Sequence, residues 1–430
     1  MISIAILSAG KGTRMKSQKA KVLHKMGGKP ILYHIVKEAK KISDDITIIV
    51  GHQGEKVREE MNSHFSNLQF LEQDLVNFSG TGGALKNYKP KGDKTLVLNG
   101  DMPLVRAEDL EQLLRIDESV AMTSIELENP SGYGRVIKNG DEVLKIVEEK
   151  DCSETEKLVK TVNAGVYFFD SKFLIESIPK LSNQNAQNEY YITDLIAIAK
   201  SENSSVKSVL VSEESFMGVN SKLQLSEAEK IHLNRIRENL MKNGVIMHLP
   251  ETIYIEDSVQ FIGECEIEQN CSIYGNSTIE NSEIKANSVI EDSYIKNSTI
   301  GVMAHIRPKS YISDSKVGNF VEVKKSNLNG VKAGHLAYLG DCEIDEGTNI
   351  GAGVITANYD GKNKYKTVIG KNVFVGSDSQ IIAPVEIPDE VMIAAGTTVP
   401  PKSKIEKGSL ALSRTKLKIL PNFFYKFFKK

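Results

Sequence analysis

A short segment near the N-terminus, LSAGKGTRM, combines glycines with cationic side chains. Gly10 and Gly12 permit a tight turn of the backbone. Lys11, Arg14 and the later Lys21 supply positive charge around that turn. The segment follows an apolar run and precedes a helical pattern, where backbone N–H groups can hold phosphate. It lacks the third glycine of the dinucleotide fingerprint and the final Gly-Lys-Ser/Thr of the P-loop. We predict a phosphate site of another kind; the alternative is a glycine turn with solvated charges.

An acidic side chain follows a second apolar run. Asp101 stands in LNGDMP, directly after KTLVL, and open α/β sheets bind their ligands at the carboxyl ends of such strands. A carboxylate there can bind Mg²⁺, which prefers oxygen ligands and shares them with phosphates. Taken alone, such an aspartate is equally well a helix cap or a turn residue.

A third group of polar residues lies in the second half of the chain. His335, in KAGHLAYLGD, is accompanied by Arg307, Lys324, Tyr338 and Asn349, and by the polar segment NYDG. Histidine side chains titrate near neutral pH, which suits general base catalysis. On spacing alone, an ordinary surface histidine remains the alternative.

The elements that must position these groups change character near residue 250. Residues 1–220 alternate β-branched runs with helical patterns, which is typical of a parallel sheet covered by helices. From Leu223 onwards, apolar residues follow one helical face until Gly244, which predicts a linker helix.

Beyond that helix an aliphatic residue recurs every six positions. The series are Ile267, Ile273 and Ile279, and later Ile369, Val375, Ile381, Ile387, Ile393, Val399 and Ile405. A hexapeptide period predicts a parallel β-helix, in which stacked coils bury a continuous apolar column. The segment ANYDGKNKYKT, residues 357–367, interrupts the period and is expected to loop out.

Length and composition limit the class of protein. A chain of 430 residues exceeds the ~250–300 residues of a single core, so we expect two domains. Its 54 basic and 56 acidic residues give a net charge of −2, which argues against a nucleic-acid partner. No apolar run reaches the ~20 residues of a membrane span, and the N-terminus indicates a buried strand rather than a signal peptide. We expect a cytoplasmic protein without integral membrane association, whose four scattered cysteines are reduced and structural.

The motifs together resemble a known family over essentially the whole chain. LSAGKGTRM, KVLH, NGDMPL, PSGYGR, IVEEKD, VNAGVY and GVNSKLQLS resemble nucleotidyltransferases that join a sugar 1-phosphate to a nucleotide. With AHIRPKS, NFVEVKKS, KAGHLAYLGD, NIGAG and ANYDG, the chain resembles the bacterial bifunctional N-acetylglucosamine-1-phosphate uridyltransferases/glucosamine-1-phosphate N-acetyltransferases. The resemblance implies an α/β Rossmann-like nucleotidyltransferase domain (1–221), a linker helix (222–247), a left-handed parallel β-helix acetyltransferase domain (248–408) and a C-terminal tail (409–430).

The resemblance also implies the activity. The enzyme acetylates glucosamine 1-phosphate with acetyl-CoA, then transfers UMP from UTP to N-acetylglucosamine 1-phosphate and releases pyrophosphate. The product, UDP-N-acetylglucosamine, serves peptidoglycan and lipopolysaccharide synthesis. Members of the family require Mg²⁺ and are homotrimers whose acetyltransferase sites lie between neighbours, so the same is expected here.

The resemblance assigns the residues of the first site. Arg14 and Lys21 would neutralise the phosphates, while Asp101 and Asn220 would coordinate Mg²⁺. The nucleotide and the N-acetylglucosamine would contact Leu7, Ala9, Gly10, Gln73, Gly80, Thr81, Asn99, Gly134, Glu148, Asn163 and Asn220. Gln73 is our choice for reading uracil, although the six residues DLVNFS separate it from Gly80 and the family spacing is shorter.

The second site is assigned in the same way. His335 would be the general base that deprotonates the glucosamine amine. The sugar phosphate would contact Arg307, Lys324, Tyr338, Asn349, Asn358, Tyr359 and Lys364; acetyl-CoA would contact Ala352, Ser377, Ala395 and Arg414.

Two other functional classes stay open on sequence. One is a nucleotidyltransferase for another sugar or base, with a β-helix that only oligomerises; the cluster around His335 argues against it. The other is a noncatalytic assembly protein, which leaves both phosphate motifs unexplained. The aromatic and basic tail PNFFYKFFKK is expected to pack on a neighbouring subunit, the alternative being contact with a membrane surface.

Overall fold

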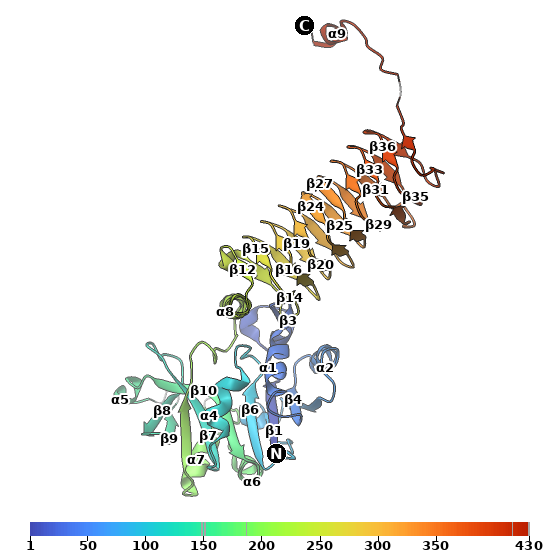
Figure 1. Cartoon of the computed structure of the whole chain (residues 1–430). Coiled ribbons are helices and arrows are strands. Elements are labelled where there is room, and N and C mark those ends of the chain that lie inside the picture. Colours follow the sequence, from blue (N-terminus) through green and yellow to red (C-terminus); the bar gives the residue numbers. More distant parts are fainter. Residues whose placement is uncertain (148, 150–151, 186, 415, 429–430) are drawn as a thin grey trace. The chain divides into compact units, whose positions relative to one another are not determined.

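The computed structural model describes residues 1–147, 149, 152–185, 187–414 and 416–428. The described residues form two compact units, Met1–His232 and Leu233–Lys430, whose elements are labelled in Figure 1. In the described part of the chain, no helix is both long and apolar enough to span a membrane.

Unit 1 is built on one nine-stranded sheet. Its order is β5 (Gln69–Glu72), β4 (Ile46–Val50), β1 (Ile2–Ser8), β6 (Lys94–Asn99), β10 (Thr161–Asp170), β7 (Val120–Glu126), β11 (Val206–Leu210), β9 (Glu142–Val147) and β8 (Arg135–Asn139). The first four strands are parallel, whereas β10 runs antiparallel to both β6 and β7. The expectation of a parallel sheet therefore holds for these four strands and for the pair β7 and β11, whereas β10 and the β8–β9 hairpin pair antiparallel.

Apolar residues cover both faces of this sheet. In β1, Ile4 and Ile6 belong to one buried cluster and Ala5 to the other, as the alternation along a strand requires. The first cluster includes the apolar face of α1 (Ile31–Ala39), and the second includes that of α7 (Asp194–Ser201). The remaining short elements are β2 (Lys25–Met26), β3 (Lys29–Pro30), α2 (Gly54–Asn62), α3 (Thr81–Ala84), α4 (Glu111–Leu114), α5 (Glu154–Lys157) and α6 (Ser171–Ser177).

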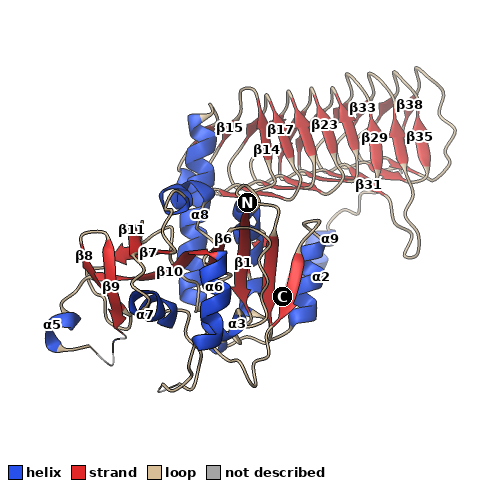
Figure 2. Cartoon of the chain, turned by 90° about the horizontal axis from the view of Figure 1, so that it is seen from below, coloured by secondary structure: helices blue, strands red, loops and turns tan. Residues whose placement is uncertain are grey.

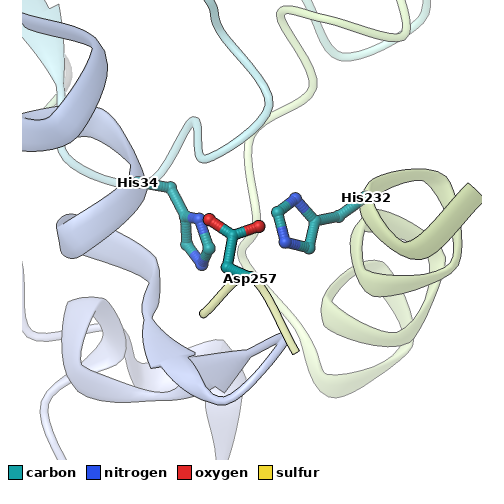
Figure 3. A group of neighbouring side chains, drawn as sticks. All are labelled: His34, His232 and Asp257. Carbon is teal, nitrogen blue, oxygen red and sulfur yellow. The ribbon is translucent and has the colours of Figure 1, made fainter. Parts of the chain in front are cut away.

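The long helix α8 (Lys222–Lys242) is followed by Gly244, at a φ of +97°, as the helical pattern predicted. Within unit 1, its first turns pack through Ala228 against Met26 and Val219. The rings of His34 in α1 and His232 in α8 meet edge to face with centroids 4.7 Å apart (Figure 3). These contacts fix the segment that leads into α8.

Unit 2 is a β-helix of three parallel sheets, whose short stacked strands are drawn in red in Figure 2. The first sheet contains β12 (Ile246–Met247), β15 (Glu266–Ile267), β18 (Glu283–Ile284), β21 (Thr299–Ile300), β24 (Lys316–Asn319), β27 (Lys332–His335), β30 (Asn349–Ile350), β33 (Phe374–Val375), β36 (Met392–Ile393) and β38 (Leu410–Ala411). The second contains β13 (Tyr254–Ile255), β16 (Ser272–Tyr274), β19 (Val289–Glu291), β22 (His305–Arg307), β25 (Glu322–Lys324), β28 (Tyr338–Gly340), β31 (Ile355–Ala357), β34 (Gln380–Ile382) and β37 (Thr398–Val399). The third contains β14 (Gln260–Ile262), β17 (Thr278–Glu280), β20 (Tyr294–Lys296), β23 (Tyr311–Ser313), β26 (Asn327–Asn329), β29 (Cys342–Ile344), β32 (Thr367–Ile369) and β35 (Val385–Ile387).

The six-residue series is the core of this unit. From Ile267 to Val399 its members are buried and belong to one apolar cluster, against which Ile405 packs partly exposed. Each coil can bury its inward side chains only against the next coil, which explains the regular recurrence. The cysteines at 152, 265, 271 and 342 are all free and buried, as expected. A short helix, α9 (Phe423–Phe428), follows in the tail.

Candidate functional site

The first site lies where the chain reverses its direction of crossover in the unit 1 sheet. From β1 the chain crosses to β4 and β5 on one side, then returns to β6 on the other side. Leu7 and Asn99 are direct register partners at the ends of β1 and β6. The Gly100 N–H donates to the Leu7 carbonyl oxygen over 2.8 Å. The glycine loop and the NGD turn therefore lie side by side, at the place where open α/β sheets bind ligands.

A cavity of about 720 Å³ opens at this point. The predicted residues that line it are Leu7, Ala9, Gly10, Arg14, Lys21, Gln73, Gly80, Thr81, Asn99, Asp101 and Asn220, and Lys11 lines it as well. The structure thus brings together, in one cavity, residues that the sequence analysis predicted to contact phosphate, base and metal and that lie far apart in the chain.

Three of these side chains form one charged cluster. The Lys21 Nζ donates to Asp101 Oδ2 over 2.5 Å and to Asn220 Oδ1 over 3.0 Å. The Val219 N–H donates to the Asp101 main-chain carbonyl over 2.7 Å, and the Asn220 N–H donates to Gln224 Oε1 over 2.9 Å. A carboxylate oxygen and an amide oxygen therefore converge on a single cation. This donor set fits Mg²⁺, which takes oxygen ligands of these two kinds.

Gln73 is buried at the edge of the same cavity. Its Nε2 donates to the carbonyl oxygens of Phe78 and Gly80 over 2.8 and 2.9 Å. The longer loop closes on itself, because Asp74 Oδ1 accepts from the N–H groups of Val76 and Asn77. With its nitrogen held by the loop, the Gln73 amide offers its oxygen as an acceptor to a ligand.

A second hollow of about 1000 Å³ shares Arg14, Asn99, Asp101 and Asn220 with the first cavity, and Asn163 lines it. The main-chain N–H of Asn163 donates to the Gly134 carbonyl oxygen over 3.1 Å, and its Nδ2 donates to the Tyr167 hydroxyl over 2.7 Å. Gly134 does not line this hollow itself, but it is hydrogen-bonded to Asn163, which does. Glu148 lies outside the described residues.

In unit 2, three cations gather on one face of the β-helix. Arg307 in β22 and Lys324 in β25 are register partners on adjacent coils. The pKa of Lys324 is lowered, first because the Lys364 amino group lies within hydrogen-bonding reach, then by desolvation and by the charges of Lys364 and Arg307. Tyr338 stands on the next coil, opposite Glu322. Arg307 also donates to Glu322 Oε1 over 2.8 Å, so its charge is paired, whereas the two lysines repel each other. A phosphate dianion would relieve that repulsion.

Lys364 comes from the segment that interrupts the hexapeptide period. Asn358 Nδ2 donates to Asp341 Oδ2, and the Tyr365 N–H donates to the Asn358 carbonyl oxygen over 2.8 Å. An isolated antiparallel bridge joins Tyr359 to Lys364. The segment loops out as predicted, and its own hydrogen bonds give it a defined shape.

His335 is exposed at the end of β27. Along the same corner of successive coils, Gly353 N–H donates to His335 O, Asp378 N–H to Ala352 O, and Gly396 N–H to Ser377 O. Ala395 continues this column, because a Cβ on Gly376 would lie 2.4 Å from its nitrogen. Asn349, in β30, pairs with Lys332 of the His335 strand. Arg414 lies exposed beyond β38, and the contacts of the described residues do not join it to this corner.

Comparison with known proteins decides the family. Residues 4–135 match the model of the MobA-like NTP transferase domain, and residues 366–401 match six repeats of the bacterial transferase hexapeptide. A Nitratiruptor protein named bifunctional protein GlmU is 58% identical over 100% of this chain and 99% of its own length. A protein of the same name from Aliarcobacter butzleri is 56% identical over 99% and 98%. The chain belongs to the GlmU family.

The resemblance inferred from the sequence is confirmed by this GlmU membership. The chain is a bifunctional uridyltransferase and acetyltransferase of UDP-N-acetylglucosamine synthesis. Its fold is an α/β Rossmann-like nucleotidyltransferase domain followed by a left-handed parallel β-helix.

Several residues that line the two cavities were not predicted from the sequence. The first cavity is also lined by Leu75, Ser79, Glu189 and Tyr191, and the second hollow by Tyr133, Glu213 and Glu214. The segment around Tyr190 is held beside Gly82, because the Gly82 N–H donates to the Tyr190 carbonyl oxygen over 2.8 Å. The paired tyrosines of NEYYITD are the only sequence signal, and they resemble no phosphate motif.

Proposed function

We propose that the cavity of unit 1 binds UTP with Mg²⁺ and transfers UMP to N-acetylglucosamine 1-phosphate, and that the His335 corner of unit 2 acetylates glucosamine 1-phosphate with acetyl-CoA. The observation that carries the first assignment is the convergence of Asp101 and Asn220 on one cation inside a cavity that Arg14 also lines.

In uridyl transfer, a phosphate oxygen of N-acetylglucosamine 1-phosphate attacks the α-phosphorus of UTP. The bond from that phosphorus to the bridging oxygen breaks, and pyrophosphate leaves. Arg14 and Lys21 hold and neutralise the phosphates, so the chain acts by positioning and by charge. Asp101 and Asn220 would hold Mg²⁺, which when bound adds further neutralisation of phosphate charge.

The remaining residues of this site recognise the base and the sugar. Gln73 accepts the uracil N–H through its amide oxygen. Leu7, Ala9, Gly10, Gly80 and Thr81 surround the nucleotide, while Asn99, Gly134, Glu148 and Asn163 contact the N-acetylglucosamine ring.

In acetyl transfer, His335 takes a proton from the glucosamine amine as its nitrogen attacks the thioester carbonyl carbon. The carbon–sulfur bond breaks and coenzyme A leaves as the thiolate. Arg307, Lys324 and Lys364 hold the phosphate. Tyr338, Asn349, Asn358 and Tyr359 position the sugar, and Ala352, Ser377, Ala395 and Arg414 line the acetyl-CoA path.

We further propose a cytoplasmic homotrimer. Support comes from the exposure of the second site: His335 lies on the outside of its coil, and Tyr359 is 60% exposed. One coil covers a ligand from one side only, so a neighbouring copy would complete the site. Sedimentation equilibrium tests this, and a monomer with full acetyltransferase activity would contradict it.

Product analysis by mass spectrometry tests both activities. One tube holds the protein with Mg²⁺, UTP, acetyl-CoA and glucosamine 1-phosphate; the other holds Mg²⁺, UTP and N-acetylglucosamine 1-phosphate. UDP-N-acetylglucosamine is expected in both. Product in the second tube alone would remove the catalytic role given to His335.

A further inference from the structure

The Lys21 side chain joins the two proposed metal ligands. Its ammonium group has three N–H donors, and two of them reach Asp101 Oδ2 and Asn220 Oδ1 over 2.5 and 3.0 Å. The side chains of Lys21 and Asp101 are only 14% and 20% exposed. The ion pair is therefore largely shielded from water, and its electrostatic attraction is stronger than that of a surface pair.

This placement conflicts with a metal ion at the same oxygens. Mg²⁺ lies about 2.0–2.1 Å from its ligands, and a cation that touches both oxygens must lie between them, where the Lys21 nitrogen now stands. Two positive charges a few ångströms apart in a shielded cavity repel each other strongly. One of the two cations has to leave.

The cavity offers Lys21 another partner when nucleotide binds. Arg14 and Lys11 line the same cavity, which is where the triphosphate is expected, and a triphosphate carries more negative charge than one carboxylate. The stem of Lys21 is held at its base, since Gly12 lies so close that a Cβ there would be 2.6 Å from the Lys21 Cβ. Its flexible end is the part that can change partner.

We infer that Lys21 is an exchangeable counterion: it occupies the metal position in the nucleotide-free enzyme and moves to the phosphates when UTP binds. The inference rests on the proposed roles of Asp101 and Asn220. Its consequence is that metal ion and nucleotide bind cooperatively, because the nucleotide removes the group that blocks the metal ligands. Coupling between two ligands typically changes affinity by about 5–150-fold.

Mn²⁺ binding to the nucleotide-free protein tests the exchange. Mn²⁺ replaces Mg²⁺ as the probe, and the electron paramagnetic resonance signal of free Mn²⁺ gives its dissociation constant. In Lys21→Met the metal ligands are no longer blocked, so Mn²⁺ should bind about 10-fold more tightly than to the native protein, within the usual range of coupling. Lys11→Met removes the same charge from the same cavity and should change the affinity far less.

Two further variants make the result decisive. Lys21→Gln should show the same gain, and adding Asp101→Asn to Lys21→Met should abolish it. The unfolding temperature of unit 1, measured by differential scanning calorimetry, shows in each case whether the mutated unit is folded. If neither Lys21 variant binds Mn²⁺ more tightly than the native protein, the proposed movement of Lys21 is refuted. If Mn²⁺ binding in the presence of UTP still depends on Asp101 in that case, the proposed metal site is nevertheless supported. If Asp101→Asn leaves Mn²⁺ binding with UTP unchanged, the proposed metal site is wrong and the inference falls with it.

Discussion

Gln73 and Gly80 are joined by a hydrogen bond of 2.9 Å from the side-chain Nε2 to the main-chain carbonyl oxygen. A second bond, from the same nitrogen to the Phe78 carbonyl, fixes the plane of the amide. The loop between Gln73 and Gly80, which is longer than the family spacing, thus orients the Gln73 side chain.

Gln73→Glu should therefore impair uridyl transfer. A carboxylate cannot donate to the two carbonyl oxygens, and leaving such buried groups unpaired costs about 1–3 kcal/mol. We expect kcat/KM for UTP to fall by about 5–150-fold, with a smaller fall for CTP. Acetyl transfer by the same preparation is the control, and an unchanged ratio of UTP to CTP use would exclude Gln73 as the base-reading residue.

The two activities should separate by mutation. Asp101→Ala removes a proposed metal ligand and should abolish uridyl transfer while acetyl transfer remains. His335→Ala removes the proposed general base, which typically contributes about 10²–10⁴-fold, and should do the reverse. Each variant is assayed for both products, with the oligomeric state measured beside it. Loss of both activities from either folded variant would show that the sites are not independent.

The pH dependence of sugar phosphate binding should reflect Lys324. The pKa of Lys324 is lowered by the neighbouring Lys364 amino group, by desolvation and by the Arg307 charge. A bound phosphate favours the protonated lysine, so affinity is full below that lowered pKa and is lost as the pH rises through it. This loss should begin below the ordinary lysine range, near ~10.4.

Lys364→Met removes the largest cause of the lowered pKa, so the loss of affinity should move to higher pH. Calorimetric titration of glucosamine 1-phosphate over a pH series measures it. Lys366→Met is the matched control, since Lys366 lies on the same loop but pairs with Glu343. The same pH of half-maximal affinity in the native protein and Lys364→Met would refute the coupling between the two lysines.

Sequence periodicity predicted the β-helix because each coil must repeat the same buried positions, as Ile267, Ile273 and Ile279 do. The position of Asp101 at the ligand-binding edge of the sheet was predictable as well, because open α/β sheets bind ligands at the carboxyl ends of their strands. Contacts that depend on topology were not predictable. Lys21 and Asn220 are 199 residues apart in the chain, and nothing in their local sequences indicates that they meet. The antiparallel course of β10 was missed for the same reason, because strand direction is set by pairing across the sheet.

A side chain at Gly12 should destabilise unit 1 more than one at Gly10. Its φ is +61°, and a Cβ there would lie 2.6 Å from the Lys21 Cβ, whereas a Cβ on Gly10 would meet no atom within 4 Å. The left-handed backbone alone costs a residue with a side chain about 1–2 kcal/mol, so Gly12→Ala should lower the unfolding temperature of unit 1 by about 2–8 °C. Gly10→Ala should leave that temperature nearly unchanged. Differential scanning calorimetry of the whole chain compares the two variants. Because the added methyl group also displaces Lys21, Gly12→Ala should lower the rate of uridyl transfer even at assay temperatures at which unit 1 remains folded. An unfolding temperature and an activity equal to those of the native protein would show that Gly12 does not hold Lys21 in place.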